Sequence, residues 1–327
     1  MKKTVLLLLA AALAACGQTS KSNADQIRDA LPSSAALQIN APNPSGGAGA
    51  TAMVTDGASR AMTADGKSDL AVSSYVLATS VNLGVGIVLA ELEWLTLLPP
   101  TTCTADACTW GPGSAATDLS DWMLVVTKVG GSYDYALSAR PKVGGTGFVT
   151  VIDGTATPGA APHHGKGVLS VYFDAEATLP HPAGWTQTDF GTMTATYDAT
   201  VPLQLQVVWK GTLDNDPAAT PGTKANALYD FDAGARDLVV AWQTIEANPA
   251  TLSLHTRWNA AGAGRADFQM AQNPATVTKS ECWNGAAAQY AQVYDSYDSA
   301  TLLPVGDPAL CAFQDQAVVS PLDFSKL

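Results

Sequence analysis

The sequence predicts a mainly β protein: a large antiparallel meander of about ten strands, curled into an open or closed barrel around one long N-terminal helix. Three observations support this. From Trp110 onward, apolar and polar residues alternate with a period of two, and Gly-rich or Asp/Asn-rich turns separate the alternating runs. Before Trp110, the apolar stretch from Ser68 to Leu98 has the length and capping residues of a helix. A β-sandwich is the alternative fold, because two packed sheets produce the same alternation.

The chain begins with the features of an export signal. Lys2 and Lys3 form a positive start, Val5 to Leu13 an apolar run, and Leu13-Ala14-Ala15-Cys16 a small-residue cleavage site that ends on a thiol. This tetrad resembles the lipobox of bacterial lipoproteins, which implies cleavage before Cys16, a diacylglycerol on its sulfur and acylation of the freed amine. An ordinary secretory signal followed by an unrelated cysteine is the alternative.

The resemblance predicts where the protein resides. We expect residues 1–15 to be removed as a signal peptide, Cys16 to be the lipid anchor, and residues 16–24 to be a polar tether. Gly17 follows the cysteine, and a residue other than Asp at that position resembles the default for export to the outer membrane. We therefore expect a lipid-anchored outer-membrane protein, on the periplasmic or the cell-surface face, whose membrane partner is reached through the N-terminal lipid.

Composition limits the other partners. The chain of 327 residues has a formal net charge of −12, and only 14% of its residues are charged. An acidic protein repels nucleic acid, so we expect no nucleic-acid partner. We also expect no second window with the roughly 18 uncharged apolar residues of a membrane-spanning helix, which would leave the lipid as the sole attachment.

Four cysteines remain besides Cys16, an even number that suits disulfides in an oxidising compartment. Four cysteines can pair in three ways. We favour the one with two local bridges, Cys103 with Cys108 and Cys282 with Cys311. A zinc site would need a CxxC pair or a well-spaced histidine partner, which these cysteines lack. We therefore expect no metal and no cofactor.

The N-terminal region contains the predicted helices. Ala24 to Leu31 is predicted as a short helix ended by Pro32, and Ala36 to Ile39 as a first strand. Residues 25–67 form the N-terminal segment, and within it residues 41–67, rich in Gly and Ala, are predicted as a mobile loop.

Ser68 to Leu98 is predicted as one long helix. Ser68 and Asp69 can cap its start, and Pro99 follows its end because a proline ring removes a backbone donor and clashes with the preceding turn. Its middle is apolar on nearly every face, so we expect protein to enclose most of it, with Ile87 buried and Glu91 in solvent. Residues 68–98 and 99–327 are expected to form one domain.

Alternation marks the strands. In residues 202–211, for example, Leu205 and Val207 point to one face while Gln204 and Gln206 point to the other. The predicted strands that share this pattern are Trp122–Val129, Tyr133–Arg140, Gly147–Asp153, Gly167–Asp174, Gly191–Asp198, Pro202–Gly211, Ala225–Phe231, Leu238–Ile245, Leu252–Trp258 and Arg265–Met270.

Motifs whose spacing encodes a mechanism are absent: the sequence has no Gly-x-Ser-x-Gly, HExxH, phosphate-binding loop or EF-hand loop. We therefore assign no catalytic residue. His163 and His164 lie in a Gly/Pro-rich loop, His181 between prolines, and His255 on the polar side of its strand. We interpret them as solvated; a metal held where two loops meet is the alternative.

Acidic and aromatic clusters receive similar interpretations. Asp214-Asn215-Asp216 resembles half of a calcium loop but is expected to be a plain turn. Asp295, Asp298 and Asp307, together with Tyr294 and Tyr297, are expected in a solvated C-terminal loop. Three tryptophans occupy the apolar side of predicted strands: Trp209, Trp242 and Trp258. We expect them in the core, and an exposed aromatic stripe that binds carbohydrate or lipid is the alternative.

The order of several short motifs resembles a known group of proteins. The motifs are Val81-Asn82-Leu83-Gly84-Val85, Pro99-Pro100-Thr101, Trp110-Gly111-Pro112, Arg140-Pro141-Lys142, Arg257-Trp258, Gly262-Ala263-Gly264-Arg265-Ala266-Asp267 and Glu281-Cys282-Trp283. Together, from about residue 70 to about residue 315, they resemble the uncharacterised lipoproteins found in many copies in myxobacteria. That resemblance implies a lipoprotein and implies no activity or catalytic residue.

We expect a non-catalytic binding or structural role, with the protein partner unidentified. A carrier of a lipid or another hydrophobic ligand is the alternative, since a curved sheet around an apolar helix resembles in outline the half-barrel lipoprotein carriers and the lipocalins. A sizeable apolar cavity between helix and sheet would favour that carrier. A secreted hydrolase is the third hypothesis and would need two carboxylates, or a Ser/His pair, in one cleft.

Overall fold

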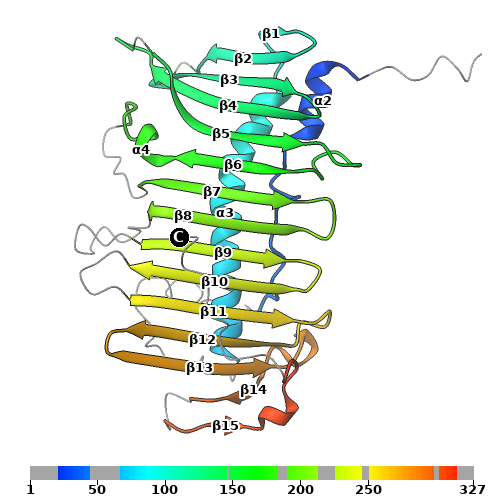
Figure 1. The fold of residues 1–327 in the computed structure, drawn as a ribbon, viewed down its shortest axis with the longest axis vertical. Coiled ribbons are helices and arrows are strands. Elements are labelled where there is room, and N and C mark those ends of the chain that lie inside the picture. The colour runs from blue at the N-terminus through cyan, green and yellow to red at the C-terminus, as the bar shows by residue number, and fades with distance from the viewer. Residues whose placement is uncertain are drawn as a thin grey trace, which may run out of the picture.

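A computed structural model of the chain describes residues 21–44, 67–115, 117–145, 147–182, 190–212, 225–244, 250–297 and 302–314. These residues form one antiparallel sheet of fifteen strands together with a long helix, α3 (Asp69–Leu97), and several short helices. In Figure 1 the strands stack one above another, and α3 crosses behind them. The fold is therefore mainly β, with the long helix on one face of the sheet.

Each strand pairs only with its neighbours in sequence. The strands are β1 Thr102–Cys103, β2 Ala107–Gly113, β3 Ser120–Val129, β4 Ser132–Pro141, β5 Val149–Thr157, β6 Lys166–Tyr172, β7 Thr192–Asp198, β8 Gln204–Thr212, β9 Ala225–Asp232, β10 Asp237–Thr244, β11 Ala250–Trp258, β12 Gly264–Gln272, β13 Ala275–Trp283, β14 Gln292–Asp295 and β15 Val305–Gly306.

The prediction of a meander is confirmed, and all ten predicted strands are present as β3 to β12. The predicted number is too low, because β1, β2, β13, β14 and β15 extend the sheet at both ends. Three of these contain only two to four residues, too few to show a period. Ala36 to Ile39 is not a strand; Leu37 and Ile39 are buried in the core without joining the sheet.

The sheet does not close. β1 and β15 are the two ends of the strand order and do not pair with each other, so the structure shows an open sheet rather than a closed barrel. The single sheet also replaces the alternative of a two-sheet sandwich. Since α3 covers the apolar face, that face is buried without closure, and the two edges are strands of only two residues each.

α3 begins and ends where predicted. The Ser68 hydroxyl accepts a hydrogen bond from the N–H of Ala71, 3.2 Å away, and the helix ends at Leu97, just before Pro99. One face of the helix, with residues three or four apart, is buried against the sheet: Leu70, Ala71, Ser74, Ala78, Val81, Val85, Leu89, Leu92 and Thr96. The Ser74 and Thr256 hydroxyls lie 2.6 Å apart in this interface.

The opposite face of α3 is exposed, and here the sequence prediction is wrong. Ile87 is 56% exposed, as are Leu83 at 64%, Trp94 at 62% and Leu97 at 68%. The apolar pattern predicts that protein encloses most faces of the helix. An open sheet covers one face of α3 and leaves the opposite face exposed. Glu91 is exposed, as expected.

The expectation that no second apolar window exists is also wrong. Residues 70–90 contain no charged side chain, and within the described ranges α3 is the one helix long and apolar enough to cross a membrane. A third of its most apolar window, 33%, is buried inside the protein.

The predicted short N-terminal helix is confirmed as α2 (Asn23–Ala30). It lies beside the C-terminal end of α3, where the Arg28 guanidinium donates two hydrogen bonds, of 3.1 and 2.7 Å, to the carbonyl of Thr96. The following segment continues along α3, since Ile39 exchanges two hydrogen bonds with the side chain of Asn82. Cys16 and most of the predicted loop 41–67 lie outside the described residues.

The four remaining cysteines form two pairs at disulfide distance, consistent with the pairing we favoured. Cys103 and Cys108 lie opposite each other in the β1–β2 hairpin with a Cα–Cα distance of 4.0 Å. Cys282 of β13 pairs with Cys311 at a Cα–Cα distance of 5.6 Å. One bridge therefore lies near each end of the sheet.

Candidate functional site

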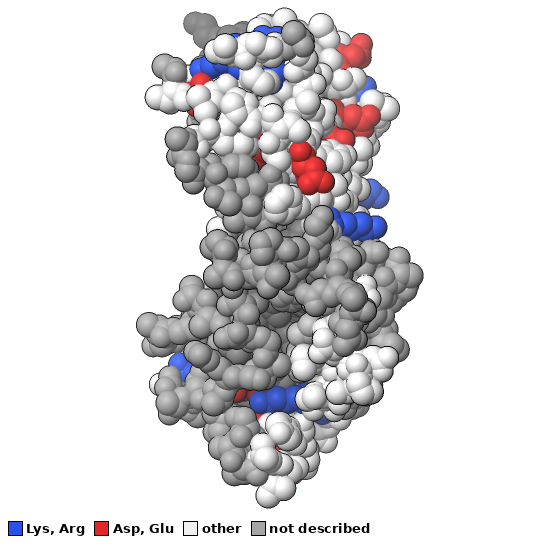
Figure 2. All heavy atoms as spheres, turned by 90° about the vertical axis from the view of Figure 1, so that its left-hand side faces the viewer, with Lys and Arg blue, Asp and Glu red and all other residues white. Residues whose placement is uncertain are grey.

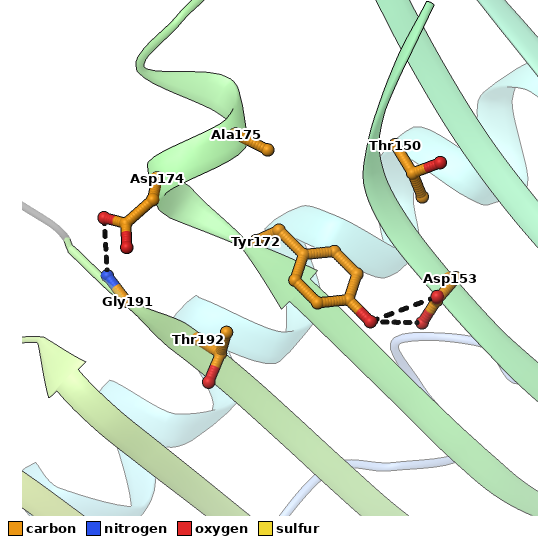
Figure 3. A pocket seen from close by; sticks show the side chains of 7 residues that line it. All are labelled: Thr150, Asp153, Tyr172, Asp174, Ala175, Gly191 and Thr192. Atoms are coloured by element: carbon orange, nitrogen blue, oxygen red, sulfur yellow. Dashed lines mark hydrogen bonds between the residues drawn. The ribbon is translucent and has the colours of Figure 1, made fainter.

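The larger described pocket lies on the sheet face opposite α3. It has a volume of about 410 Å³ and is lined by residues of β5, β6, α4 (Phe173–Glu176) and β7. In Figure 3 the side chains of Thr150, Asp153, Tyr172 and Thr192 stand on the near side of the strands, with α3 behind them. The pocket is open to solvent on this outer face, and its lining mixes polar and apolar groups.

Hydrogen bonds fix two walls of this pocket. The Tyr172 hydroxyl donates to the Asp153 carboxylate and lies 3.1 Å from each oxygen (Figure 3). Burial, and then the hydrogen bond and charge of Asp153, raise the pKa of Tyr172. On the other side, the Gly191 N–H donates to Asp174 at 2.9 Å. Gly191 has a φ of +79°, and a Cβ there would meet the Lys210 carbonyl, so only glycine fits.

The pocket residues are suited to binding a polar ligand. The carboxylates of Asp153 and Asp174 can accept hydrogen bonds from a hydroxyl-rich ligand, while the hydroxyls of the two threonines and of Tyr172 can accept or donate them. The lining contains no histidine, cysteine or lysine that could serve as a base or nucleophile beside a hydroxyl. A hydrolase was expected to need two carboxylates, or a Ser/His pair, in one cleft. Two carboxylates, Asp153 and Asp174, do line this pocket, and they accept hydrogen bonds from the Tyr172 hydroxyl and the Gly191 N–H; the lining contains no Ser/His pair.

A smaller pocket, about 110 Å³, lies where α2 meets the end of α3. Its lining includes Arg28, Glu93 and His163, all of which have structural partners. Besides the Arg28 bonds to Thr96, Glu93 accepts from the Ser34 N–H at 2.6 Å, and His163 Nδ1 lies 2.9 Å from the Leu31 carbonyl. These polar groups join α2 to the rest of the fold.

The four histidines do not converge. His164 Nδ1 lies 3.1 Å from the Ala199 carbonyl, and His181 Nε2 lies 3.2 Å from the Glu176 carbonyl. His255 lies on the polar side of β11, as predicted, with Nε2 at 2.8 Å from Asp237. In the part of the chain that the structure describes, no group of three or more His, Cys, Asp or Glu residues is arranged to hold a metal ion.

A buried charged cluster at the start of α3 was missed by the sequence analysis. Lys279 of β13 lies 2.5 Å from Glu281, 3.2 Å from Asp295 of β14 and 3.9 Å from Asp69 of α3. The side chains of Glu281 and Asp295 are fully buried. We expected Asp295 in a solvated loop, and this expectation is wrong, because Asp295 lies in the protein interior.

Burial and charge act in opposite directions in this cluster. Burial raises the pKa of Glu281, although the charge of Lys279 and hydrogen bonds from Leu70 and Ser68 lower it in part. Burial opposes the charge on Lys279, but the carboxylates of Glu281 and Asp295 outweigh it and raise the pKa of the Lys279 amine. The cluster thus holds one cation among several carboxylates and acts as a structural connection.

The other two C-terminal aspartates differ from Asp295. Asp307 is exposed and caps a short helix, accepting from the Ala309 N–H at 2.9 Å, which agrees with a solvated loop. Tyr297 is 44% exposed and Tyr294 half-buried. Asp298, like the predicted turn Asp214-Asn215-Asp216, lies outside the described residues.

A second charged group lies on the outer face of β10 to β13. Arg265 lies 3.2 Å from the buried carboxylate of Asp267, which also accepts a hydrogen bond from Ser280. The Arg257 guanidinium lies 5.2 Å from the centre of the Phe313 ring. The C-terminal segment that carries Phe313 and the bridged Cys311 therefore lies against this face.

The tryptophan prediction is confirmed for two of the three residues. Trp209 is 7% exposed and packs edge-on against Tyr229 at a ring distance of 5.2 Å. Trp258 is 5% exposed and stacks on Phe231 at 6.0 Å. Trp242 is half-buried. The exposed aromatic residue of the α3 face, Trp94, was not singled out from the sequence, since nothing in the apolar pattern marks which side of α3 the sheet leaves open.

Comparisons of the chain with protein-family models, with curated proteins and with solved structures found no match. The resemblance to myxobacterial lipoproteins therefore stays a prediction drawn from the order of short motifs.

Proposed function

We propose that this chain is a lipid-anchored extracytoplasmic protein with a non-catalytic binding or structural role. The observation that supports it best is the use of the two sheet faces. On β7, the buried side chains of Met193, Ala195 and Tyr197 alternate with accessible threonines. α3 covers the apolar face, and the outer face of β5 to β7 carries the open pocket lined by Asp153 and Tyr172.

The packing under α3 favours this proposal over a lipid carrier. Val81 and Leu89 of α3 and Val207 of β8 have no exposed surface. A Cβ added at Gly84 would lie only 3.4 Å from the Trp209 ring. Both described pockets lie away from this interface, one on the outer face and one beside α2. A hydrophobic ligand would need the cavity that these side chains fill.

Figure 2 shows the side of the molecule that lies at the left of Figure 1; most of the described atoms there belong to uncharged residues, and the acidic groups gather in the upper half. The pocket of Asp153 and Tyr172, with its threonine and tyrosine hydroxyls, suits a neutral, hydroxyl-rich ligand. This is tested by measuring the binding of a panel of neutral oligosaccharides to wild type, to Asp153→Asn and to Asp134→Asn, an exposed control. Equal affinities for all three proteins would contradict a ligand site at Asp153, and the structural role would then be the remaining proposal.

The anchor is tested by detergent-phase partition. Wild type is expected in the detergent phase with an acylated Cys16 peptide by mass spectrometry, and Cys16→Ser is expected to carry no acyl chain and to partition into the detergent phase much less than wild type. The double variant Cys103→Ser/Cys108→Ser is the control, because it removes two other cysteines and leaves Cys16 intact. A Cys16→Ser protein that enters the detergent phase to the same extent as wild type would contradict the anchor, as would an unmodified Cys16 peptide; a stoichiometric co-purifying lipid would support the carrier instead.

A further inference from the structure

The exposed face of α3 carries an apolar stripe, with Ala90 and the exposed Glu91 between its two halves. Leu83, Ile87, Trp94 and Leu97, here called the α3 stripe, are each more than half exposed. Their spacing of four, seven and three residues places them on one side of the helix, opposite the residues that contact the sheet. Leu97 follows Leu83 by 14 positions, so the stripe is about 21 Å long.

A stripe of this kind indicates a partner. Single exposed apolar residues are ordinary, but four large ones on one side of a helix form an apolar surface that water solvates poorly. A helix that is apolar on every face is normally enclosed by protein or by lipid. The sheet supplies protein on one side only, so the other side requires a second apolar environment.

The position of the N-terminus identifies that environment. α2 lies against the C-terminal end of α3, because Arg28 binds the carbonyl of Thr96, which lies between Trp94 and Leu97 in the chain. Figure 1 shows α2 beside this end of the helix. Lys21 follows Cys16 by only five positions, and an extended chain covers at most roughly 3.6 Å per residue, or about 18 Å. A lipid on Cys16 would therefore hold this end of α3 near the bilayer.

We propose that the α3 stripe lies on the surface of a lipid bilayer, parallel to it, and this inference rests on the proposed lipid anchor. α3 lies on the membrane rather than spanning it, because its other face is packed against the sheet. Trp94 takes the headgroup level that tryptophan prefers. The acidic net charge of −12 disfavours anionic lipids, so the partner is a neutral lipid surface.

The experiment uses the mature chain without its lipid, that is, residues 16–327 with Cys16→Ser, exported behind an ordinary secretory signal. The purified protein is mixed with phosphatidylcholine vesicles, and flotation measures the fraction of protein bound to them. The Leu83→Ser/Ile87→Ser/Trp94→Ser variant is expected to lose at least about tenfold in vesicle partition, because it removes three buried apolar contacts with lipid. Val143→Ser/Leu310→Ser is the control, since these residues are 92% and 71% exposed and lie outside α3. In brominated phosphatidylcholine, Trp94→Phe should remove most of the tryptophan quenching.

The outcomes separate this inference from the proposed function. If the unacylated wild type does not float, or floats as well as the triple variant, the membrane contact is wrong even when Cys16 is acylated in cells. If the wild type instead forms a dimer in sedimentation that the triple variant abolishes, the stripe binds a second copy and the inference is again overturned. If mass spectrometry finds Cys16 unmodified, the proposed anchor fails, whatever the vesicles show.

Discussion

The ammonium group of Lys279 lies 2.5 Å from Oε1 of Glu281, two residues further along the same face of β13. The other oxygen of Glu281 accepts the N–H of Leu70, 3.0 Å away in the first turn of α3. One ion pair in the sheet therefore continues directly into the start of the helix. The contact joins residues 211 positions apart in sequence, in a fold whose strand pairs are otherwise all between neighbours.

Lys279→Met is expected to destabilise the protein by about 3–5 kcal/mol, because it leaves the buried carboxylates of Glu281 and Asp295 without their counter-charge. Chemical denaturation of the purified protein measures this loss. Lys128→Met, on an exposed position of β3, is the matched control and should change the free energy of unfolding by less than about 0.5 kcal/mol. Similar losses for both lysines would show that the cluster contributes little.

The pH dependence of stability should reflect Glu281. Its pKa is raised in the folded protein, so the native state binds the proton more tightly than the unfolded state does. The resulting stabilisation is complete below the ordinary value of 4.5 and is lost as the pH rises through the raised pKa. Denaturation curves above pH 4.5 should therefore show wild type losing stability relative to Glu281→Gln. Parallel pH profiles for the two proteins would contradict this assignment.

Two neighbouring residues of α3 should respond differently to truncation. Leu89→Ala is expected to cost about 2–5 kcal/mol, because Leu89 has no exposed surface and its removal leaves a cavity against the sheet. Ile87→Ala should cost less than about 1 kcal/mol in the lipid-free protein, since that side chain is 56% exposed. Urea titration of both variants measures the difference, and a reversed order would mean that the helix faces are assigned the wrong way round.

The two disulfides should contribute unequally. Loop-closure entropy predicts about 3.5 kcal/mol for the bridge over 29 positions, Cys282 to Cys311, and about 2 kcal/mol for the bridge over five, Cys103 to Cys108. Thermal denaturation of the two double Cys→Ala variants measures the order of these losses. Non-reducing peptide mapping that links Cys103 to Cys282 or Cys311 would refute both bridges.

The predictable part of the fold is the part with an uninterrupted period. β3 to β12 were identified because apolar side chains alternate with polar ones along each of them. In β13 the face turned toward α3 carries Lys279 and Glu281, and in β2 Gly111 and Pro112 interrupt the run, so neither strand shows the expected alternation. Sequence alternation reports the polarity of a face, and a buried ion pair reverses that signal.

The site was less predictable than the fold for a similar reason. Asp295 is a solvated aspartate by sequence, and only its pairing with Glu281 across β13 and β14 places it beside Lys279. Ile87 and Leu89 are equally apolar in sequence, and only the position of the sheet decides which one is buried. Asp153 and Tyr172 lie 19 positions apart and meet because β5 and β6 are adjacent strands.

Each strand is hydrogen-bonded only to its neighbours in sequence. The position of a strand in the sheet therefore does not depend on pairing with a strand that is distant in sequence. Removing or duplicating one hairpin would leave the direction of every other strand unchanged, since two strands restore the antiparallel alternation. Such a change alters the width of the sheet, measured across the strands, by roughly 10 Å, which corresponds to about two turns of a helix lying across it. The length of this molecule can therefore evolve in steps of one hairpin matched by two helical turns, with the rest of the architecture retained.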